Sequence, residues 1–321
     1  MIRYVAKRAL IGIITILLAF TLTFFLTRIV PGNPIRVLAG KDNPNPKQIA
    51  YLTEYYGLDK PHHEQFVIYL GKLLKGDFGR SIVNNRPVVE IIGEKIAPTL
   101  LLSLCGSFFS ILIGTALGLY TGKRINSTAD RILTNISYII DAIPAFWLSM
   151  MFIILFATKL RWFPTTGMYS IRETYEGWEK VKDLIQHLVL PVSVIVVINV
   201  PYYFRISRAS VRQVMNEDFI STLRATGMNE GKIYRKYVLR NALIPVITAS
   251  GLSLAFALSG VALIEIVFAW PGMGRVILNA VGKRDYNMLS GVYLMLSVCI
   301  SVFMIITDLV YAWVDPRIRL E

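Results

Sequence analysis

The sequence is short of charge and of chemically reactive side chains. Charged residues make up 17% of the chain, against about 25% in soluble globular domains. Of its two cysteines, Cys105 and Cys299, each lies inside an apolar run, which is typical of small packing side chains and argues against a disulfide or metal pair. Of its three histidines, His62 and His63 are adjacent and so point apart, whereas His187 begins an apolar run, where we expect an interfacial position. We expect no metal site.

Motifs that would mark an enzyme are also missing. The sequence contains neither H-E-x-x-H nor G-x-S-x-G. The stretch from Gly118 to Lys123 resembles a P-loop only faintly, because it lacks the G-x-x-x-x-G-K-[ST] spacing and ends an apolar run instead of following a strand. We therefore expect that the chain is not an enzyme, does not bind or hydrolyse ATP, and holds no cofactor of its own.

Long hydrophobic runs are what the sequence has in abundance. Hydrophobic residues make up 54% of the chain, and the mean hydropathy is +0.53. A helix needs about 20 apolar residues to cross a bilayer. The first run is too long for the core of a signal peptide and no A-x-A site follows it, so we expect it to be retained. We predict an all-α membrane protein with six transmembrane helices, namely Ala9–Val30, Thr99–Tyr120, Ile132–Ala157, Leu188–Ile206, Ala242–Ala269 and Leu289–Trp313.

Basic residues gather between the apolar runs. The net charge is +13, but Lys and Arg occupy short segments and not one aromatic-studded face, which argues against nucleic-acid binding. These segments precede the first helix, join the second to the third and the fourth to the fifth, and follow the sixth. By the positive-inside rule we expect a multi-pass protein of the cytoplasmic (inner) membrane with both termini in the cytoplasm. The longest segment carries Arg205, Arg208, Arg212, Arg224, Lys232, Arg235, Lys236 and Arg240.

The segment from Pro31 to Pro98 then lies on the outer side. A turn signal at Asn43–Pro46 and polar helical stretches near Ile49–Tyr56 and Glu64–Leu74 indicate a small extracytoplasmic subdomain between the first two helices. We predict two parts: residues 1–97, which hold the first transmembrane helix and this subdomain, and residues 98–321, which hold a core of five transmembrane helices.

Small residues recur at every fourth position of the predicted second helix, at Gly106, Ser110, Gly114, Gly118 and Gly122. Such a ridge lets another helix approach closely. It predicts either an interface with another subunit or ordinary packing within the chain, and the sequence leaves both open.

Three acidic residues fall within predicted spans. Asp141 lies about 14 Å along the third helix and just before Pro144, near a possible helix break. An acid at such a depth is a candidate for a transport pathway. Glu265 lies near the outer end of the fifth helix, where an acid costs less. Asp308 lies near the inner end of the sixth, where we expect it to pair with Arg317 or a neighbouring loop.

The segment between the fourth and fifth helices carries the most information. Asp218 suits a helix N-cap and Gly227 a helix C-terminus. Phe219, Leu223 and, beyond the glycine, Ile233 repeat with amphipathic spacing. We predict a short helix that lies across the inner membrane surface and is either inert on anionic lipid or bound to a soluble partner.

This segment resembles the coupling loop of ABC importer permeases, in particular the B-type permease subunits of dipeptide, oligopeptide and nickel importers. The matching residues are Asp218, Ile220, Thr222, Arg224, Ala225, Gly227 and Leu239–Pro245, whereas Ser221–Leu223 departs from the general motif. The resemblance covers nearly the whole chain. It includes Leu58–Pro61, Gln65, Gly76–Gly79, Ser81 and Pro87–Val88, then Glu265–Phe268, Pro271–Gly274, Arg284–Tyr286, Asp308 and Asp315–Arg319.

The resemblance implies a type I ABC importer transmembrane fold and a permease subunit for di- or oligopeptides. It also implies a second permease subunit, two ATPase subunits that hold ATP and Mg, and an extracytoplasmic solute-binding protein. Within the loop 207–241, the residues expected to contact an ATPase are Asp218, Phe219, Thr222, Leu223, Ala225, Thr226, Gly227 and Met228. The residues expected along the pathway are Asp141, Pro144, Asn199, Ser253 and Glu265.

Other functions stay open at this point. The same machine would import nickel or another small solute if its binding protein selected one. Asp141 also suits a secondary transporter without ATPases, although such a protein would have no need of the segment from Asp218 to Pro245. An intramembrane enzyme would need paired catalytic residues at one depth, and the sequence shows none.

Overall fold

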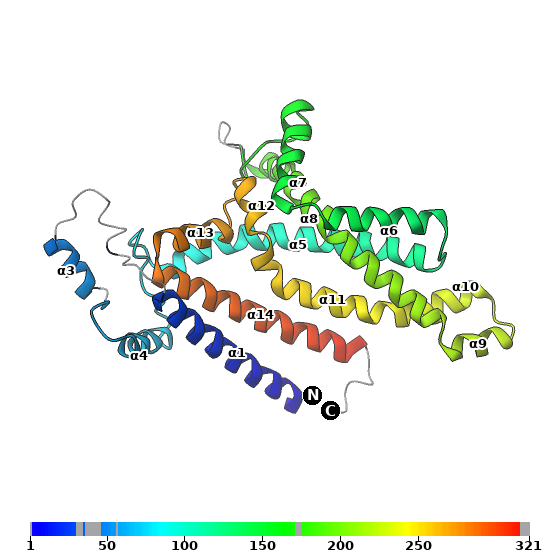
Figure 1. Cartoon of the computed structure of the whole chain (residues 1–321), viewed down its shortest axis with the longest axis horizontal. Helices are drawn as coiled ribbons and strands as arrows, with labels where there is room; N and C mark the ends of the chain where they lie inside the picture. Colours follow the sequence, from blue (N-terminus) through cyan, green and yellow to red (C-terminus); the bar gives the residue numbers. More distant parts are fainter. Residues whose placement is uncertain (1, 30–34, 36–45, 56, 171–174, 315–321) are drawn as a thin grey trace. The chain divides into compact units, whose positions relative to one another are not determined.

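The computed structural model describes residues 2–29, 35, 46–55, 57–170 and 175–314, and most of them are helical. These residues form no β-strand, and an isolated β-bridge joins Arg80 to Pro87. The all-α fold is therefore confirmed. The helices are α1 (Ile2–Ile29), α3 (Pro46–Tyr55), α4 (His62–Leu73), α5 (Val88–Gly122), α6 (Thr128–Asp141), α7 (Ala145–Phe152), the π-helix η1 (Ile153–Lys159), α8 (Gly177–Met215), α9 (Asp218–Ala225), α10 (Glu230–Lys232), the π-helix η2 (Ile233–Val238), α11 (Leu239–Gly260), α12 (Ala262–Val267), α13 (Met273–Lys283) and α14 (Tyr286–Val314) (Figure 1).

The long apolar helices match the predicted membrane spans in number. Among the described residues, five stretches are long and apolar enough to cross a membrane, and a sixth crossing exists if the bent pair of α6 and α7–η1 is one span. The five are Arg8–Ile29, Val88–Gly122, Gly177–Met215, Glu230–Leu254 and Tyr286–Thr307.

The third predicted span is broken into two helices, at the possible break beside Pro144. α6 ends at Asp141, α7 begins at Ala145, and the two parts are bent by 101°. Pro144 stands at the N-cap of α7 with an extended backbone, ψ 135°. A proline has no N–H to donate and disfavours helical backbone at the residue before it, here Ile143. The chain therefore turns directly after Asp141.

The fourth and fifth predicted spans also have different bounds. α8 has 39 residues and runs through both Pro191 and Pro201, so it is far longer than the predicted Leu188–Ile206. The predicted helix Ala242–Ala269 is wrong as a single helix, because Val261, at φ −97° and ψ 0°, separates α11 from α12. A long α8 places the basic residues after Tyr203 on a continuous helix instead of in a loop.

The chain forms two compact units, of which the first comprises Met1–Pro98 and Gly272–Val302. In this unit α1 packs on α4 through aromatic rings: the centroids of Phe24 and Phe66 are 5.2 Å apart, and those of Phe20 and Tyr69 are 5.8 Å apart. Burial raises the pKa of the Tyr69 hydroxyl. The helical stretches predicted outside the first span are confirmed as α3 and α4.

A buried aspartate organises the same unit. Asp285, 2% exposed, accepts hydrogen bonds from the Ser81 hydroxyl at 2.5 Å, from the backbone N–H groups of Ile82 and Val83 at 3.1 and 3.3 Å, and from that of Met288 at 3.1 Å. One carboxylate thus joins the segment before α5 to the first turn of α14.

The second unit comprises Thr99–Pro271 and Phe303–Glu321. Here the glycine ridge of α5 packs on α8. A Cβ atom added at Gly106 would lie 2.4 Å from the Ile195 side chain, and one added at Gly118 would lie 2.5 Å from the carbonyl oxygen of Phe204. The ridge therefore serves packing within the chain. The two units are defined by contacts within the chain and do not test the predicted domain boundary. A boundary between residues 97 and 98 therefore stays a prediction.

Candidate functional site

The predicted coupling helix is present as α9, with a change at its start. Glu217 occupies the N-cap with φ −72° and ψ 145°, and Asp218 is the first helical residue, so the prediction of Asp218 as N-cap was wrong by one position. Its carboxylate still lies in the first turn, where the helix dipole favours negative charge.

The end of α9 was predicted correctly. Gly227 has φ +77°, a left-handed conformation that glycine adopts without steric cost. Its N–H donates to the carbonyl of Arg224 at 2.9 Å, and the Met228 N–H donates to the carbonyl of Leu223 at 3.2 Å. These two bonds form a Schellman motif, which stops the helix and turns the chain back.

One side of α9 is fixed to the protein by apolar contacts. Ile220 is fully buried in a cluster with Val211, Ile233, Val238 and Ala242, against which Leu223 and Met228 also pack. Phe219, assigned by its spacing to the apolar face, is 40% exposed. That assignment was wrong for Phe219, because Ile220 and Leu223, three residues apart, form the inward side of the helix.

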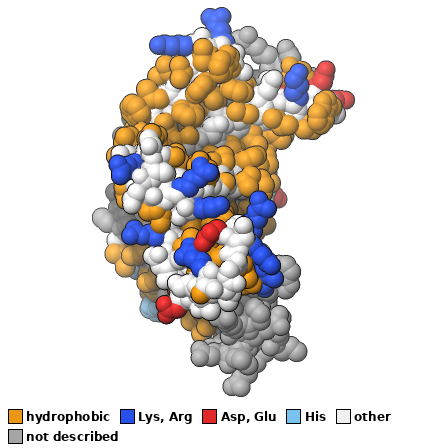
Figure 2. Space-filling view, turned by 90° about the vertical axis from the view of Figure 1, so that its right-hand side faces the viewer, with side chains coloured by type: hydrophobic (Ala, Val, Ile, Leu, Met, Phe, Trp, Pro, Cys, Tyr) orange, Lys and Arg blue, Asp and Glu red, His pale blue; other side chains and the backbone are white. Residues whose placement is uncertain are grey.

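The other side of α9 is open. Of the residues expected to contact an ATPase, Asp218, Phe219, Thr222, Ala225, Thr226 and Gly227 are exposed, whereas Leu223 and Met228 are partly buried. α9 and α10 lie beyond the ends of α8 and α11 (Figure 1). Figure 2 looks onto this end and shows Lys and Arg side chains over it, with few Asp and Glu.

Polar contacts hold the rest of the loop in place. The Arg224 guanidinium donates to Glu230 at 2.6 Å, and this hydrogen bond raises the pKa of Arg224. The Asn229 side chain caps α10 by accepting from the Gly231 N–H at 2.8 Å. The Tyr234 hydroxyl donates to the carbonyl of Leu119, on α5, at 2.6 Å. A force on α9 therefore reaches α5, α8 and α11 through direct contacts.

Two of the predicted pathway residues share a cavity. Asn199 and Ser253 line a cavity of about 270 Å³ together with Ser103, Ser107, Ala145, Ile195, Ile198, Tyr203, Val261 and Ile264. The walls come from α5, α7, α8 and α11, with Val261 and Ile264 from the broken end of the fifth span. Hydroxyl and amide groups give the cavity a polar lining inside an otherwise apolar bundle.

The other predicted pathway residues lie outside this cavity. Pro144 is exposed at the start of α7, next to the cavity residue Ala145. Asp141 pairs with Arg205 of α8, at 2.5 Å between Oδ2 and Nη1. Glu265 is fully buried and accepts a hydrogen bond from the Thr99 hydroxyl at 2.5 Å. Protein encloses this carboxylate, and its expected place near the outer end of the fifth span stays a prediction.

Two further expectations concern single residues. His187 lies buried within α8, with Nδ1 2.8 Å from the carbonyl oxygen of Asp183, and its expected place at the membrane interface stays a prediction. The partner expected for Asp308, Arg317, lies outside the described residues, as does the whole matched segment Asp315–Arg319. Within the part of the chain that the structure describes, no three His, Cys, Asp or Glu side chains are grouped as metal ligands would be.

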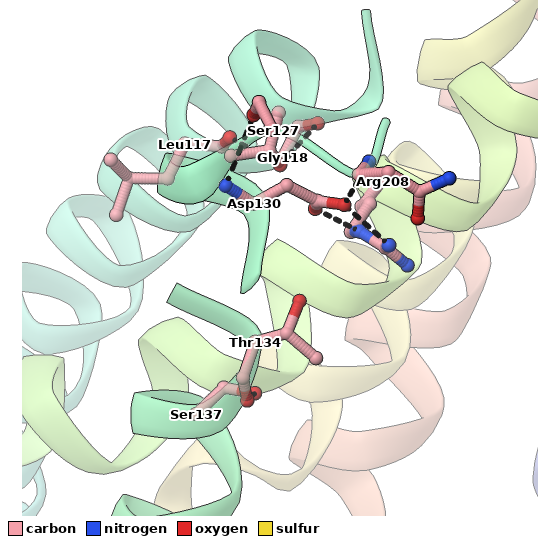
Figure 3. A network of polar contacts seen from close by, with 9 residues as sticks. Leu117, Gly118, Ser127, Asp130, Thr134, Ser137 and Arg208 are labelled. Carbon is pink, nitrogen blue, oxygen red and sulfur yellow. Dashed lines mark hydrogen bonds and ion pairs between the residues drawn. The ribbon is translucent and has the colours of Figure 1, made fainter. Parts of the chain in front are cut away.

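The sequence did not reveal the pair of Asp130 and Arg208. The Arg208 guanidinium donates to both carboxylate oxygens of Asp130, at 2.5 and 2.8 Å (Figure 3). The Asn126 N–H adds a bond of 3.0 Å to the same carboxylate, and the Ser127 hydroxyl caps α6 by accepting from the Asp130 N–H. Ser127 three residues before Asp130 was a signal for the helix start, but not for the partner 78 residues away.

Comparisons with known proteins agree with this geometry. The family model described as binding-protein-dependent transport system inner membrane component matches residues 114–320, and the N-terminal model of the same description matches residues 1–103. A dipeptide transport system permease protein of Alkalihalophilus pseudofirmus is 33% identical, with 98% of each chain covered. An oligopeptide transport system permease protein of Bacillus subtilis is 34% identical over 99% of this chain and 100% of its own.

A further relative and a solved structure are also similar to this chain. A glutathione transport system permease protein of Salmonella typhi is 35% identical, with 99% of each chain covered. The solved inward-facing structure of the MetNI methionine ABC transporter aligns with a TM-score of 0.54 at 19% identity, over 71% of this chain and 97% of that chain. At this identity the alignment supports the fold alone.

Proposed function

Since this chain belongs to the family of binding-protein-dependent transport system inner membrane components, the permease subunits of ABC importers, we propose that it imports di- and oligopeptides. The relatives over its full length that are named for dipeptide, oligopeptide and glutathione transport support this substrate class. The observation that carries the mechanism is α9, whose inner side is anchored by Ile220 while its outer side is open.

The partners follow from the same proposal. A second, related permease subunit completes the pathway, two ATPase subunits bind and hydrolyse ATP with Mg, and an extracytoplasmic protein delivers the solute. This chain contributes neither catalysis nor a cofactor. In the cytoplasmic membrane both of its termini face the cytoplasm, because the basic loop that holds α9 must meet the ATPases there.

Coupling in this proposal is mechanical. The exposed face of α9, formed by Asp218, Phe219, Thr222, Ala225 and Thr226, enters a groove of one ATPase. ATP-driven closure of the ATPases then moves α9, and its anchors transmit the motion to the long helices. Coupling needs such rigid elements with two arrangements.

The pathway runs between the two permease subunits and is lined on this side by the cavity that holds Asn199 and Ser253. The break after Asp141 and the break at Val261 border it, because Ala145 and Ile264 also line the cavity. Breaks in membrane helices expose backbone groups that suit a polar pathway.

The proposal is tested with the four-subunit complex in proteoliposomes, supplied with its binding protein, labelled dipeptide and ATP. We expect Gly227→Glu to abolish ATP-dependent uptake while the complex still assembles, because a bulky charge at the end of α9 disturbs docking. Gly57→Glu is the matched control, since Gly57 also has a positive φ, +64°, and open space around it but lies in the extracytoplasmic subdomain. Wild-type uptake by an assembled Gly227→Glu complex would contradict the coupling role. If the wild-type complex took up nickel and no peptide, the proposed peptide substrate would be wrong.

A further inference from the structure

Two opposite charges meet between α6 and α8, two helices that belong to candidate membrane spans. Asp141 is the last residue of α6, which has 14 residues, so it lies about 20 Å from the start of that helix. Its carboxylate pairs with Arg205 of α8 at 2.5 Å, yet the two side chains remain 39% and 33% exposed. Charged groups within a membrane span are too costly to face hydrocarbon. The open side of the pair must therefore face water or another protein.

A polar stripe on α8 runs through this pair. Asn199, Tyr202, Arg205 and Arg212 follow one another at intervals of three, three and seven residues, which places them on one side of a helix. Asn199, Tyr202 and Arg212 are exposed, whereas Tyr203 on the neighbouring face is buried. The stripe begins at the cavity, because Asn199 lines it.

The stripe favours an aqueous pathway over contact with lipid or with a second subunit. Membrane helices pack on one another through small residues, and the small-residue ridge of α5 is already occupied by α8. A row of amide, phenol and guanidinium groups that leads away from a polar cavity is instead suited to passing a polar solute.

We propose that Asp141 and Arg205 bind the two charged ends of a peptide as it passes the break between α6 and α7. This inference rests on the proposed function. A peptide with free ends carries an ammonium and a carboxylate near pH 7. Asp141 would accept hydrogen bonds from the ammonium, and the Arg205 guanidinium would hold the carboxylate at two points.

The two opposite charges of Asp141 and Arg205 would also favour solutes that carry two charged ends. Without solute, the ion pair satisfies both charges. A zwitterion offers each member of the pair a new partner, so the exchange leaves no charge unpaired. A solute with one charge or none would leave Asp141 or Arg205 without a partner. The neighbouring Arg208 does not compete, because it is held by Asp130. The Tyr138 ring lies 5.8 Å from the Arg205 guanidinium.

The first test measures access from water. In the assembled complex, with Cys105 and Cys299 replaced by Ala, Asp141→Cys and Tyr202→Cys are exposed to a charged, membrane-impermeant methanethiosulfonate reagent. Ile139→Cys is the matched control, since Ile139 is 64% exposed on the same helix as Asp141 but points to another side. We expect modification of Asp141→Cys and Tyr202→Cys to be at least about tenfold faster than that of the control, because a charged reagent avoids hydrocarbon. Equal rates for all three variants would overturn the inference.

The second test measures transport of a dipeptide with free ends. We expect Asp141→Asn and Arg205→Gln each to raise the KM for uptake by roughly tenfold, the loss of one charge-assisted hydrogen bond, with a smaller change in kcat. The double variant Asp141→Asn/Arg205→Gln separates the two explanations. It should transport like the wild type if the pair is only structural, and that result would overturn the inference. We expect it to retain the raised KM.

The two proposals fail differently. A wild-type complex that imports peptides, together with a double variant that also does so at the wild-type KM, overturns only the role of Asp141 and Arg205. A wild-type complex that imports no peptide, and only a solute without two charged ends, overturns the proposed function and this inference with it.

Discussion

Asp130 and Arg208 form a two-point ion pair that fixes the start of α6 to α8, with donor–acceptor distances of 2.5 and 2.8 Å. Asp130 is 2% exposed, and the Arg208 side chain is 24% exposed. Because α8 leads directly to α9, this pair lies between the coupling loop and the broken third span. We infer that α6 and α8 move as one body when α9 is pushed.

The first prediction concerns this pair. Asp130→Asn leaves the Arg208 guanidinium half-buried without a counter-charge, and breaking a buried pair in this way costs about 3 kcal/mol. We expect the variant to unfold at a clearly lower temperature in detergent and to give less assembled complex. Thermal unfolding followed by size-exclusion chromatography measures both.

The matched control is an exposed pair of the same kind. Glu94 accepts from Arg86 at 2.5 Å, but both side chains are about half exposed, 50% and 48%. Exposed pairs contribute roughly 0–1 kcal/mol, so Glu94→Gln should leave the unfolding temperature nearly unchanged. If the two substitutions lowered the unfolding temperature equally, the burial of Asp130 would make no difference to stability.

Much of the fold follows from the sequence because membrane helices depend on local features. Apolar length predicted the spans, and Gly227 predicted the end of α9, since each signal lies within a few residues. The break at Val261 did not follow from the sequence, and the break after Asp141 followed only as a possibility beside Pro144. Pro144 was visible, but Pro191 and Pro201 lie inside an unbroken α8, and only the packing around each proline decides between a break and a continuous helix.

In the candidate site, too, local sequence predicts the elements but not the contacts between them. Which residues of α9 are exposed depends on how the helix docks on the rest of the chain, and this docking puts Ile220 on the buried side and leaves Phe219 exposed. The partners of Asp130 and Asp141 lie 78 and 64 residues away. No local pattern in one sequence identifies pairs at such separations, because they depend on how α6 docks on α8.

The second prediction concerns the close approach of α5 and α8. A Cβ atom at Gly118 would lie 2.5 Å from the carbonyl oxygen of Phe204, and backbone atoms cannot yield without moving the helix. We expect Gly118→Ala to destabilise the protein by about 1–3 kcal/mol through overpacking. Thermal unfolding in detergent measures the change.

The control for this prediction lies on the same helix. Gly93 has no atom within 4 Å of an added Cβ. Gly93→Ala should be neutral or stabilising, because alanine favours a helix by up to about 1 kcal/mol over glycine. If both alanine variants behaved alike, the separation of α5 and α8 would not depend on the glycine ridge.

The third prediction concerns the backbone of Gly227. Its φ of +77° strains a β-branched residue, whereas asparagine enters this region more readily. We expect Gly227→Val to distort the end of α9 and to lower the peptide imported per ATP hydrolysed, and Gly227→Asn to retain most of it. Uptake and phosphate release measured on the same proteoliposomes give this ratio. Equal ratios in the two variants would mean that the left-handed turn is not needed for coupling.

The last prediction concerns Asp285, which holds the segment around Ser81 against the start of α14. Its carboxylate accepts from the Ser81 hydroxyl and from three backbone N–H groups, and Asp285→Ala leaves all four donors without it. Unsatisfied buried donors cost about 1–3 kcal/mol each, so the segment should detach locally before the protein unfolds. Arg80 directly precedes the held residues, so tryptic cleavage after Arg80 reports the detachment directly. We expect faster cleavage at this site in Asp285→Ala but not in Asp59→Ala, where the aspartate is exposed. Unchanged cleavage in Asp285→Ala would mean that other contacts hold this segment, and that the buried carboxylate is not what joins it to α14.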